Sequence, residues 1–380
     1  MSTYRFSFPT AIHFGAGIRS KLVPLLEAEG KNRPLIVTDR GVAALPILAE
    51  LEASLNAAQV EYRTFSAIWG NPVKSQVMAG ADAFLSHDAD CIIGFGGGAA
   101  LDVAKAIALI ATHPGDLFDY EDDKPGALPI DQAIPYLIAM PTTSGTGSEV
   151  GRSAVVSDDV THVKKIIFHP SLLARVVFAD PELTLGLPAS VTAATGVDAL
   201  THCVEAYLAA GYHPICDGIA MEGFRLAAGF LAKAVQSPND IEARTQMMMA
   251  SMMGAIAFQK GLGVTHSCAH ALGTVADMHH GLANGVMIDF ALKHNVAAAG
   301  SRMTMLAKVA GIADETPAGF LAWLRSLKSQ IGIPMNLTEA GLSRDKLPAL
   351  IAVAIADGCH GNNPVVCTKD DFERIFLDAF

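Results

Sequence analysis

The sequence predicts two domains, an α/β domain over residues 1–185 and an all-helical domain over residues 186–380. The chain has 380 residues, which is more than one ordinary hydrophobic core accommodates. Its residues are 51% hydrophobic and only 17% charged, so much of the chain must be buried. Strand-like runs alternate with helical segments up to about residue 180 and nearly vanish after residue 188.

Composition excludes several classes of protein. A formal net charge of −11 argues against a nucleic-acid partner, because the phosphate backbone attracts basic surfaces. The first residues lack the basic stretch and apolar core of a secretory signal, and Asp102 and Lys105 interrupt the most apolar segment. We therefore expect a cytoplasmic protein with no membrane span. The six cysteines form no CxxC pair and are expected to be reduced thiols.

The α/β domain is predicted from the order of its segments. The apolar runs RPLIVTD, DADCIIGFGGG and YLIAMPTTSGTGSE are separated by the helical segments VAALPILAELEASLNAA and AALDVAKAIALIA. This alternation is typical of a parallel sheet covered by helices, in which ligands gather at the carboxyl ends of the strands.

The helical domain is predicted from apolar residues at helical spacing. They indicate long helices over residues 189–210 and 240–260. Thr316 followed by Pro317 predicts a helix start, and Thr368 with Asp371 predicts a capping box. The methionines between residues 247 and 253 are expected to fill a helical core rather than to form a binding surface.

Three consecutive glycines, Gly96, Gly97 and Gly98, end a strand and lead directly into a helix. Backbone amides and the helix N-terminus can approach a pyrophosphate there without obstruction by side chains. A tight turn without a ligand explains the glycines equally well, and the acidic residue that usually follows about 20 residues on is missing. Asp39 instead ends an earlier strand, next to where an adenosine ribose could lie.

A second loop, PTTSGTGSEV, follows the strand YLIAM and carries Thr142, Thr143 and Thr146 among glycines and serines. Alone it is consistent with a solvated turn. Two loops rich in hydrogen-bond donors at successive strand ends favour a phosphate-bearing ligand.

Asp198 and His202 stand four residues apart on a predicted helix, so both side chains project from one face and can hold one ion. A lone pair of this kind more often forms a surface hydrogen bond. Glu205 shares the same face and is considered as a group that orients a metal ligand, but we expect it to be solvated.

Two histidine pairs follow, His266 with His270 and His279 with His280. Their spacing does not choose one histidine from either pair. A carboxylate combined with imidazoles suits zinc or ferrous iron, whereas calcium and magnesium prefer oxygen ligands.

The segments GGGAALD, PTTSGTGSEV, DPELT, GVDALTH, GLGVTHSCAH and HHGLANG occur in this order, and together they resemble the iron-containing alcohol dehydrogenase family. The resemblance extends from about residue 5 to the C-terminus. It implies an N-terminal dinucleotide-binding domain, a helical metal-binding catalytic domain, and a homodimer or larger oligomer. It also implies hydride transfer between a nicotinamide cofactor and a small alcohol or aldehyde whose oxygen binds Fe²⁺.

The resemblance assigns the histidines that spacing leaves open. The implied metal ligands are Asp198, His202, His266 and His280. His280 is chosen because the ligand histidine of the family directly precedes a glycine, here Gly281. His270 is then placed near the nicotinamide and the substrate, where it could relay a proton or hydrogen-bond to the cofactor.

The resemblance also implies the positions that bind the cofactor. These are Gly96, Gly97, Gly98, Asp102, Thr142, Thr143 and Thr146, with Lys165 as a looser match. We expect NAD(H) rather than NADP(H), because the Asp39 carboxylate should bind ribose hydroxyls and repel a 2′-phosphate. Arg40 opposes this expectation, since it could turn towards such a phosphate.

The substrate pocket is assigned by resemblance alone, to Ser153, Phe258, Cys359 and His360. The segment AFQKGLGVTH is one residue shorter than is usual in the family, and NNPVV stands where NPR is common. Because these differences fall at the expected pocket, the identity of the substrate does not carry over. Lys260 and Arg152 leave room for an anionic substrate.

Other functions share parts of this pattern. The nearest alternative is a zinc-dependent polyol oxidoreductase like glycerol dehydrogenase, and a lyase like dehydroquinate synthase has a similar architecture. A non-catalytic protein that binds nucleotide or metal is a further class. The pair Asp198 and His202, together with His280, favours the iron branch.

Overall fold

The computed structural model describes residues 7–8, 10–122 and 124–380, which separate into two compact units. The first, here the sheet unit, comprises the described residues up to Thr143 together with Ser148–Leu183. The second, here the helical unit, comprises Ser144–Gly147 and Thr184–Phe380. No helix in the described ranges is long and apolar enough to cross a lipid bilayer.

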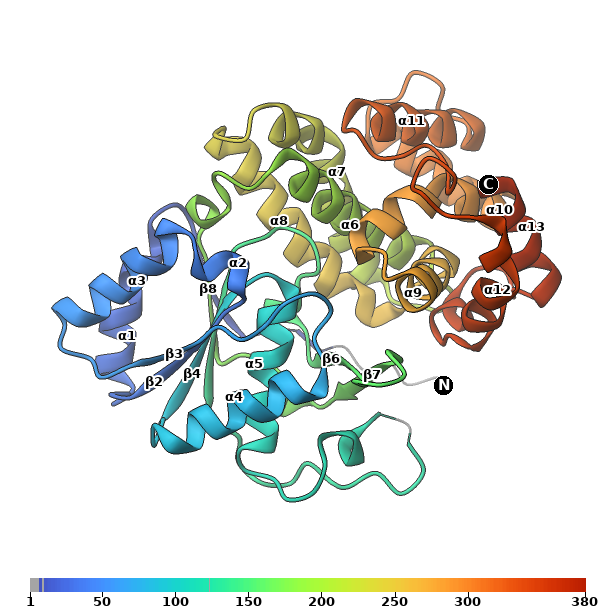
Figure 1. The fold of residues 1–380 in the computed structure, drawn as a ribbon. Coiled ribbons are helices and arrows are strands. Elements are labelled where there is room, and N and C mark those ends of the chain that lie inside the picture. Colours follow the sequence, from blue (N-terminus) through green and yellow to red (C-terminus); the bar gives the residue numbers. More distant parts are fainter. Residues whose placement is uncertain (1–6, 9, 123) are drawn as a thin grey trace. The chain divides into compact units, whose positions relative to one another are not determined.

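Six parallel strands form the sheet unit's main sheet, in the order β1-β8-β5-β4-β2-β3. Figure 1 labels β2, β3, β4 and β8 of this sheet. The strands are β1 (Ala11–Phe14), β2 (Pro34–Val37), β3 (Arg63–Phe65), β4 (Cys91–Gly96), β5 (Tyr136–Pro141) and β8 (Val176–Ala179). From β2 the chain first extends the sheet to β3 and then crosses to β4 on the other side of β2. The topological switch point, where ligands bind in sheets of this kind, therefore lies between β2 and β4.

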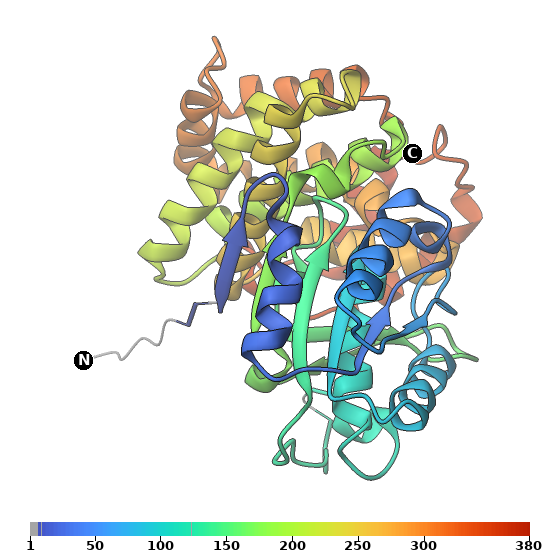
Figure 2. The same cartoon turned by 90° about the vertical axis from the view of Figure 1, so that its left-hand side faces the viewer.

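Helices cover both faces of this sheet, as Figure 2 shows. They are α1 (Leu22–Ala28), α2 (Arg40–Ala43), α3 (Pro46–Ala57), α4 (Lys74–Ser86) and α5 (Gly98–Ile110). Leu26 of α1 and Leu51 of α3 pack in one cluster with Ile93 on one face. On the other face α5 lies so close to β4 that a Cβ on Gly94 would be 3.0 Å from Leu101. An antiparallel hairpin of β6 (Ser153–Ser157) and β7 (Lys164–Phe168), which the sequence patterns did not indicate, completes the unit.

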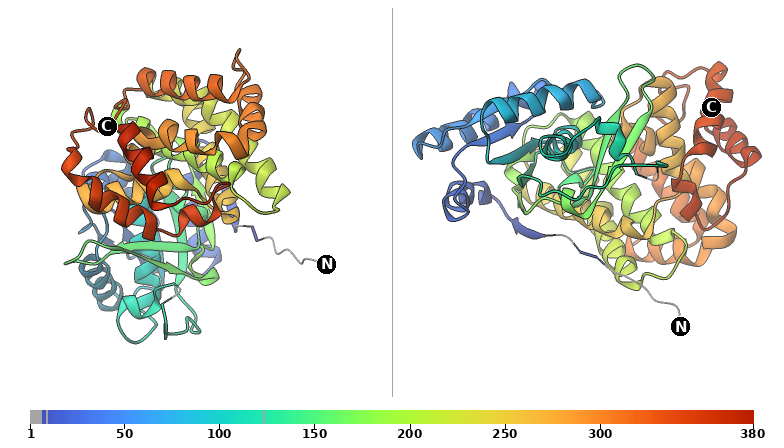
Figure 3. Two further views of the ribbon diagram at one scale, coloured as in Figure 1. Left: turned by 90° about the vertical axis from the view of Figure 1, so that its right-hand side faces the viewer. Right: turned by 90° about the horizontal axis from the view of Figure 1, so that it is seen from below.

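The helical unit contains eight α-helices in its described residues (Figure 3). They are α6 (Ala189–Leu208), α7 (Pro214–Gln236), α8 (Ile241–Ala257), α9 (Val264–Ala276), α10 (His280–Val309), α11 (Pro317–Gln330), α12 (Leu347–Ala356) and α13 (Lys369–Ala379). Helices α6, α7 and α8 pack against one another, and α10 packs against α6, α9, α11 and α13. One continuous apolar core joins them, and Met247, Met248 and Met252 are buried in the unit, as the sequence predicts.

The predicted helix starts are also confirmed. Pro317 is the first residue of α11, and the Thr316 side chain accepts a hydrogen bond from the amide of Gly319. Thr368 and Asp371 form the expected capping box at α13. All six cysteines are free thiols, and the α/β and all-helical architecture agrees with the predicted fold class.

Candidate metal centre and cofactor loops

Four polar side chains from three helices converge inside the helical unit. Asp198 and His202 lie one turn apart on α6, His266 lies on α9, and His280 is the first residue of α10. The Asp198 Oδ1 atom is 3.7 Å from Nε2 of His202, 4.0 Å from that of His266 and 3.6 Å from that of His280. One ligand atom from each residue lies within 4.8 Å of all the others.

This cluster fits a divalent ion. Its separations are too long for hydrogen bonds, but metal–ligand bonds of about 2.1 Å would place neighbouring ligand atoms roughly 3–3.5 Å apart, so a small contraction suffices. Asp198 is only 2% exposed, and a buried carboxylate requires a compensating charge. Burial lowers the pKa of His202 to about 4, so its imidazole is neutral near pH 7 and its lone pair is available to a metal.

Two glycines let neighbouring helices pack closely against α6, which carries Asp198 and His202. A Cβ on Gly281 would lie 2.2 Å from the carbonyl oxygen of Ala194 and 3.2 Å from the Cβ of Asp198. Where α8 crosses α6, a Cβ on Gly254 would lie 3.0 Å from the Cβ of His202. Any larger residue at Gly281 would push His280 away from Asp198.

The structure separates both histidine pairs that spacing left open. His279 is exposed at the N-cap of α10, where its Nδ1 accepts a hydrogen bond of 3.4 Å from Leu282, while His280 joins the cluster. His266 joins the cluster as well, whereas His270 Nδ1 lies 2.7 Å from a carboxylate oxygen of Asp357.

The prediction that Glu205 is solvated is wrong, because its side chain is buried beneath the N-terminus of α9. It accepts hydrogen bonds from the amides of Gly263 at 2.9 Å and Thr265 at 2.6 Å, which have no partner in the helix's own first turn. It also lies 2.7 Å from Nδ1 of His266. Burial opposes the ionisation of Glu205, but the hydrogen bonds and charge interaction with His266, together with the hydrogen bonds from Thr265 and Gly263, lower its pKa.

Because a carboxylate can only accept, Nδ1 of His266 carries the proton. Its unprotonated Nε2 faces the cluster, 3.3 Å from Nδ2 of Asn284. The alternative role that the sequence raised for Glu205, orienting a metal ligand, is the one that this geometry fits.

Two polar residues near the cluster, Asp357 and Asn284, were not predicted from the sequence. Asp357, at the C-terminus of α12, accepts hydrogen bonds from His270 and from Ser267, each at 2.7 Å. Burial opposes its ionisation, but these hydrogen bonds lower its pKa. Asn284 donates to Asp198 Oδ1 at 2.7 Å. Asn284 stands in the quoted segment HHGLANG, four residues after His280, so helical spacing was an available clue, whereas no local pattern marks Asp357.

The residues expected to line the substrate pocket differ in how close they lie to the metal cluster and to His270. The Phe258 ring lies edge-on to His202 at 5.2 Å and therefore borders the cluster. Cys359 Sγ lies 4.0 Å from His270 Nδ1, in a separate group with His270 and Asp357. The His360 ring packs edge-on against Phe372 at 5.3 Å, and its Nε2 lies 3.2 Å from the carbonyl oxygen of Ile355. The His360 side chain is therefore held among α12 and α13.

Of the two cations that could receive an anionic substrate, Lys260 is paired with a carboxylate and Arg152 lies over an aromatic ring. Lys260 is buried, and its Nζ donates to Asp217 at 2.5 Å and to the carbonyl oxygen of Tyr207 at 3.1 Å. In the sheet unit, the Arg152 guanidinium lies 5.9 Å from the centre of the Phe168 ring. Ser153, at the start of β6, accepts a hydrogen bond from Lys105 through its backbone oxygen.

In the sheet unit, Asp39 and the glycine loop meet at the switch point. One Asp39 oxygen caps α2 by accepting from the amide of Val42 at 2.9 Å, and the other would be 3.3 Å from a Cβ on Gly96. A Cβ on Gly97 would lie 3.3 Å from Thr143, so the loops after β4 and β5 are in contact. Gly98 is the first residue of α5, and the amide of Thr142 donates to the carbonyl oxygen of Gly96 at 3.0 Å.

Other expected cofactor residues are already hydrogen-bonded to protein groups. Asp102 accepts from Ser148 at 2.6 Å and from the amide of Val155 at 3.2 Å. Lys165 on β7 forms an ion pair of 3.0 Å with Glu121. Thr146 is half-buried in the segment Ser144–Gly147, which is counted with the helical unit.

Comparisons with known proteins cover both units. The family profile of iron-containing alcohol dehydrogenases matches residues 9–181, and the profile of the C-terminal part of the same family matches residues 192–380. The chain belongs to the iron-containing alcohol dehydrogenase family. It is therefore an oxidoreductase that acts on CH–OH groups, and the resemblance stated from its motifs is confirmed.

Individual relatives are similar over the whole chain. A 4-hydroxybutyrate dehydrogenase of Cupriavidus necator is 38% identical, over 96% of this chain and 97% of that protein. The crystal structure of a 1,3-propanediol oxidoreductase superposes with a TM-score of 0.95 at 33% identity and covers 100% of both chains. The sulfoacetaldehyde reductase of Bifidobacterium kashiwanohense, solved in complex with NAD⁺, has a TM-score of 0.88 at 28% identity, over 100% of this chain and 99% of that one.

We expect Glu205→Gln to weaken metal binding by roughly 10- to 100-fold, because the amide accepts hydrogen bonds less strongly and no longer fixes the His266 ring. The dissociation constant for Fe²⁺ or Zn²⁺ is measured by competition with a chelator. Glu222→Gln is the matched control, since Glu222 is an exposed residue of α7 paired with Arg225. An unchanged dissociation constant for Glu205→Gln would show that the carboxylate serves only to cap α9.

Proposed function

We propose that this protein is an iron-dependent alcohol dehydrogenase or aldehyde reductase that transfers a hydride between NAD(H) and a small alcohol or aldehyde. The observation that carries the proposal is the cluster of Asp198, His202, His266 and His280, with His270 stacked on His280 at a ring distance of 5.3 Å. Asp198, His202 and His266 are buried, whereas His280 is half-buried. The cluster is therefore accessible to solvent only on the side of His280, which is also the side of His270.

Each residue has a distinct role in this proposal. Asp198 and the three histidines hold the ion, which when bound supplies Lewis-acid polarisation of the substrate oxygen. Asp357 holds the proton of His270 on Nδ1, so Nε2 of His270 can accept or return a proton near the substrate. Phe258 and Cys359 are the proposed walls of the substrate pocket.

Ferrous iron is the proposed metal. One carboxylate and three imidazoles make four protein ligands, whereas catalytic zinc usually has three. An ion that accepts five or six ligands can still admit a substrate oxygen. Zinc binds most such sites more tightly than iron, so it remains the competing ion during purification.

The remaining assignments are part of the same proposal. We take residues 1–185 as the dinucleotide-binding domain and residues 186–380 as the catalytic domain. We expect a cytoplasmic homodimer or larger homo-oligomer, as is usual in the family.

Removing the ion with a chelator should abolish turnover, and anaerobic Fe²⁺ should restore it better than Zn²⁺. His202→Ala and His280→Ala should each lose metal and about 100-fold or more in activity, because each removes a ligand. Metal content and rate are measured on the same samples. His279→Ala is the matched control and should keep both, since His279 is exposed at the helix N-cap. If His279→Ala loses its ion while His280→Ala retains it, the ligand assignment is wrong.

Asp39 should give the enzyme a preference for NAD(H). Its second carboxylate oxygen faces Gly96, and Arg40 stacks on Trp69 at 3.8 Å instead of standing free to bind a phosphate. The sulfoacetaldehyde reductase structure, which holds NAD⁺, supports the same choice. Asp39→Gly should shift the ratio of kcat/KM towards NADP(H) by roughly tenfold or more, because it removes a like charge. Equal efficiency of the wild type with both cofactors would contradict the preference.

The proposed substrate is a small linear or hydroxylated alcohol, or its aldehyde. The names of the 4-hydroxybutyrate and 1,3-propanediol enzymes support short hydroxylated chains. Since Lys260 is paired with Asp217, we expect no requirement for an anionic group. In a panel of aldehydes with NADH and iron-loaded protein, kcat/KM should be highest for short linear members. Faster turnover of bulky aromatic aldehydes would refute the size limit.

A further inference from the structure

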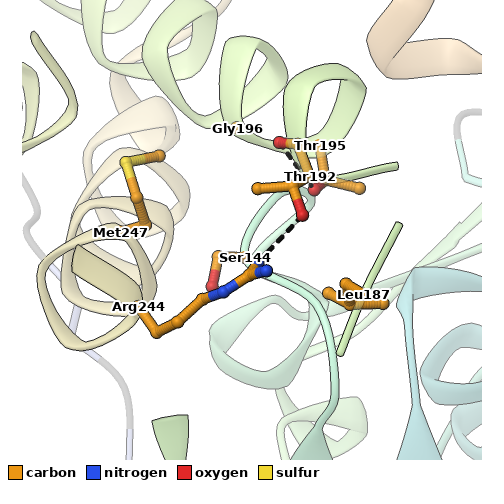
Figure 4. A pocket seen from close by; sticks show the side chains of 7 residues that line it. All are labelled: Ser144, Leu187, Thr192, Thr195, Gly196, Arg244 and Met247. Atoms are coloured by element: carbon orange, nitrogen blue, oxygen red, sulfur yellow. Dashed lines mark hydrogen bonds between the residues drawn. The ribbon is translucent and has the colours of Figure 1, made fainter. Parts of the chain in front are cut away.

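A small cavity lies in the helical unit, and none of the four residues of the metal cluster lines it. It is lined by Ser144, Leu187, Thr192, Thr195, Gly196, Arg244 and Met247. Figure 4 shows Arg244 reaching from α8 towards Thr192, with the Ser144 side chain beside its guanidinium. The cavity volume is about 10 Å³, close to the smallest space that admits one water-sized particle.

Arg244 brings a buried charge to this cavity. Its side chain is only 3% exposed, with Nε donating to the carbonyl oxygen of Pro238 and Nη1 to Thr192 Oγ1, each at 2.9 Å. Its Nη2 is buried without a hydrogen-bond partner among the described residues. Burial lowers the pKa of Arg244, and no carboxylate of the described residues raises it again. Because a guanidinium does not lose its proton in proteins, the positive charge stays and is uncompensated.

A second unpartnered donor lines the same space. The Ser144 hydroxyl is buried and has no hydrogen-bond partner within the described chain. Leu187 and Thr192 flank the N-terminus of α6, a helix of 20 residues whose N-cap, Pro188, offers no side-chain cap. The positive end of this helix dipole therefore also borders the cavity.

We propose that this cavity is a binding site for a small monovalent anion such as chloride, held between Arg244, Ser144 and the first turn of α6. A water molecule would satisfy the two donors but would leave the guanidinium charge without compensation. Phosphate, sulfate and carboxylates have several heavy atoms, whereas this space admits about one water-sized particle. A monatomic anion supplies both the charge and the acceptor.

The ion would also hold a loop in place. Ser144 begins the segment Ser144–Gly147, in which the carbonyl oxygen of Gly145 accepts from Ser251 at 3.1 Å and a Cβ on Gly147 would be 2.1 Å from that of Ala255. The anion would hold Ser144 at the start of this segment, while contacts with α8 hold Gly145 and Gly147.

The site is tested by thermal unfolding in sodium chloride against sodium gluconate at one ionic strength, because gluconate is too large for the cavity. The Tm of the wild-type protein should rise by about 2–4 °C in a saturable way as chloride replaces gluconate. Arg244→Met should abolish this rise and Ser144→Ala should reduce it. Arg225→Met is the matched control and should keep the rise, because Arg225 is exposed on α7 and paired with Glu222.

Crystals of the full chain grown in chloride give the second readout. At long X-ray wavelength chloride scatters anomalously and water does not, so an anomalous peak between Arg244 and Ser144 is expected. Equal Tm values in the two salts, or density at the site without an anomalous peak, would show that the cavity holds water only and would overturn the proposal. If Arg244→Met fails to fold, the reduced chloride response of Ser144→Ala decides.

Discussion

A carboxylate that is only 2% exposed cannot be left uncompensated, and the arrangement of the helical unit follows from this requirement at Asp198. Three imidazoles from α6, α9 and α10 surround the same oxygen at 3.6–4.0 Å. Such convergence requires close helix packing, as Gly281 allows between α10 and α6; Gly254 likewise lets α8 approach α6 beside His202. The buried charge of Asp198 therefore requires both the close helix packing and the ability of the site to hold an ion.

The sequence predicted the elements well where periodicity and caps agree. The helix that carries Asp198 and His202, the start of α11 at Pro317 and the strand leading to Gly96 were all expected from local pattern. The sequence could not reveal contacts between distant segments. Glu205 looked like a solvated residue because its partners lie about 60 positions away at the start of α9. Asp357 has no local motif at all, and only the fold brings it to His270.

In the sheet unit, a residue that belongs to a cofactor-binding motif does not necessarily contact the cofactor. Asp39, Gly96 and Gly97 meet at the switch point between β2 and β4, where topology favours a ligand. Asp102 stands in the same motif, yet it ties α5 to Ser148 and β6 beside the fully buried Lys105. A residue of this kind shapes the loops through packing, whether or not it touches the cofactor.

Phe258 and Cys359 begin two short 3-10 segments, Phe258–Lys260 and Cys359–Asn362, which meet where a Cβ on Gly261 would be 2.5 Å from that of Asn362. The ligands Asp198 and His266, by contrast, stand within packed helices. Evolution can therefore exchange the residues beside the reactive centre without disturbing the centre itself, because short connections tolerate replacement better than helix interfaces do. Divergence of substrate range among related chains then requires few mutational steps, and those steps are expected to be coupled across the two segments.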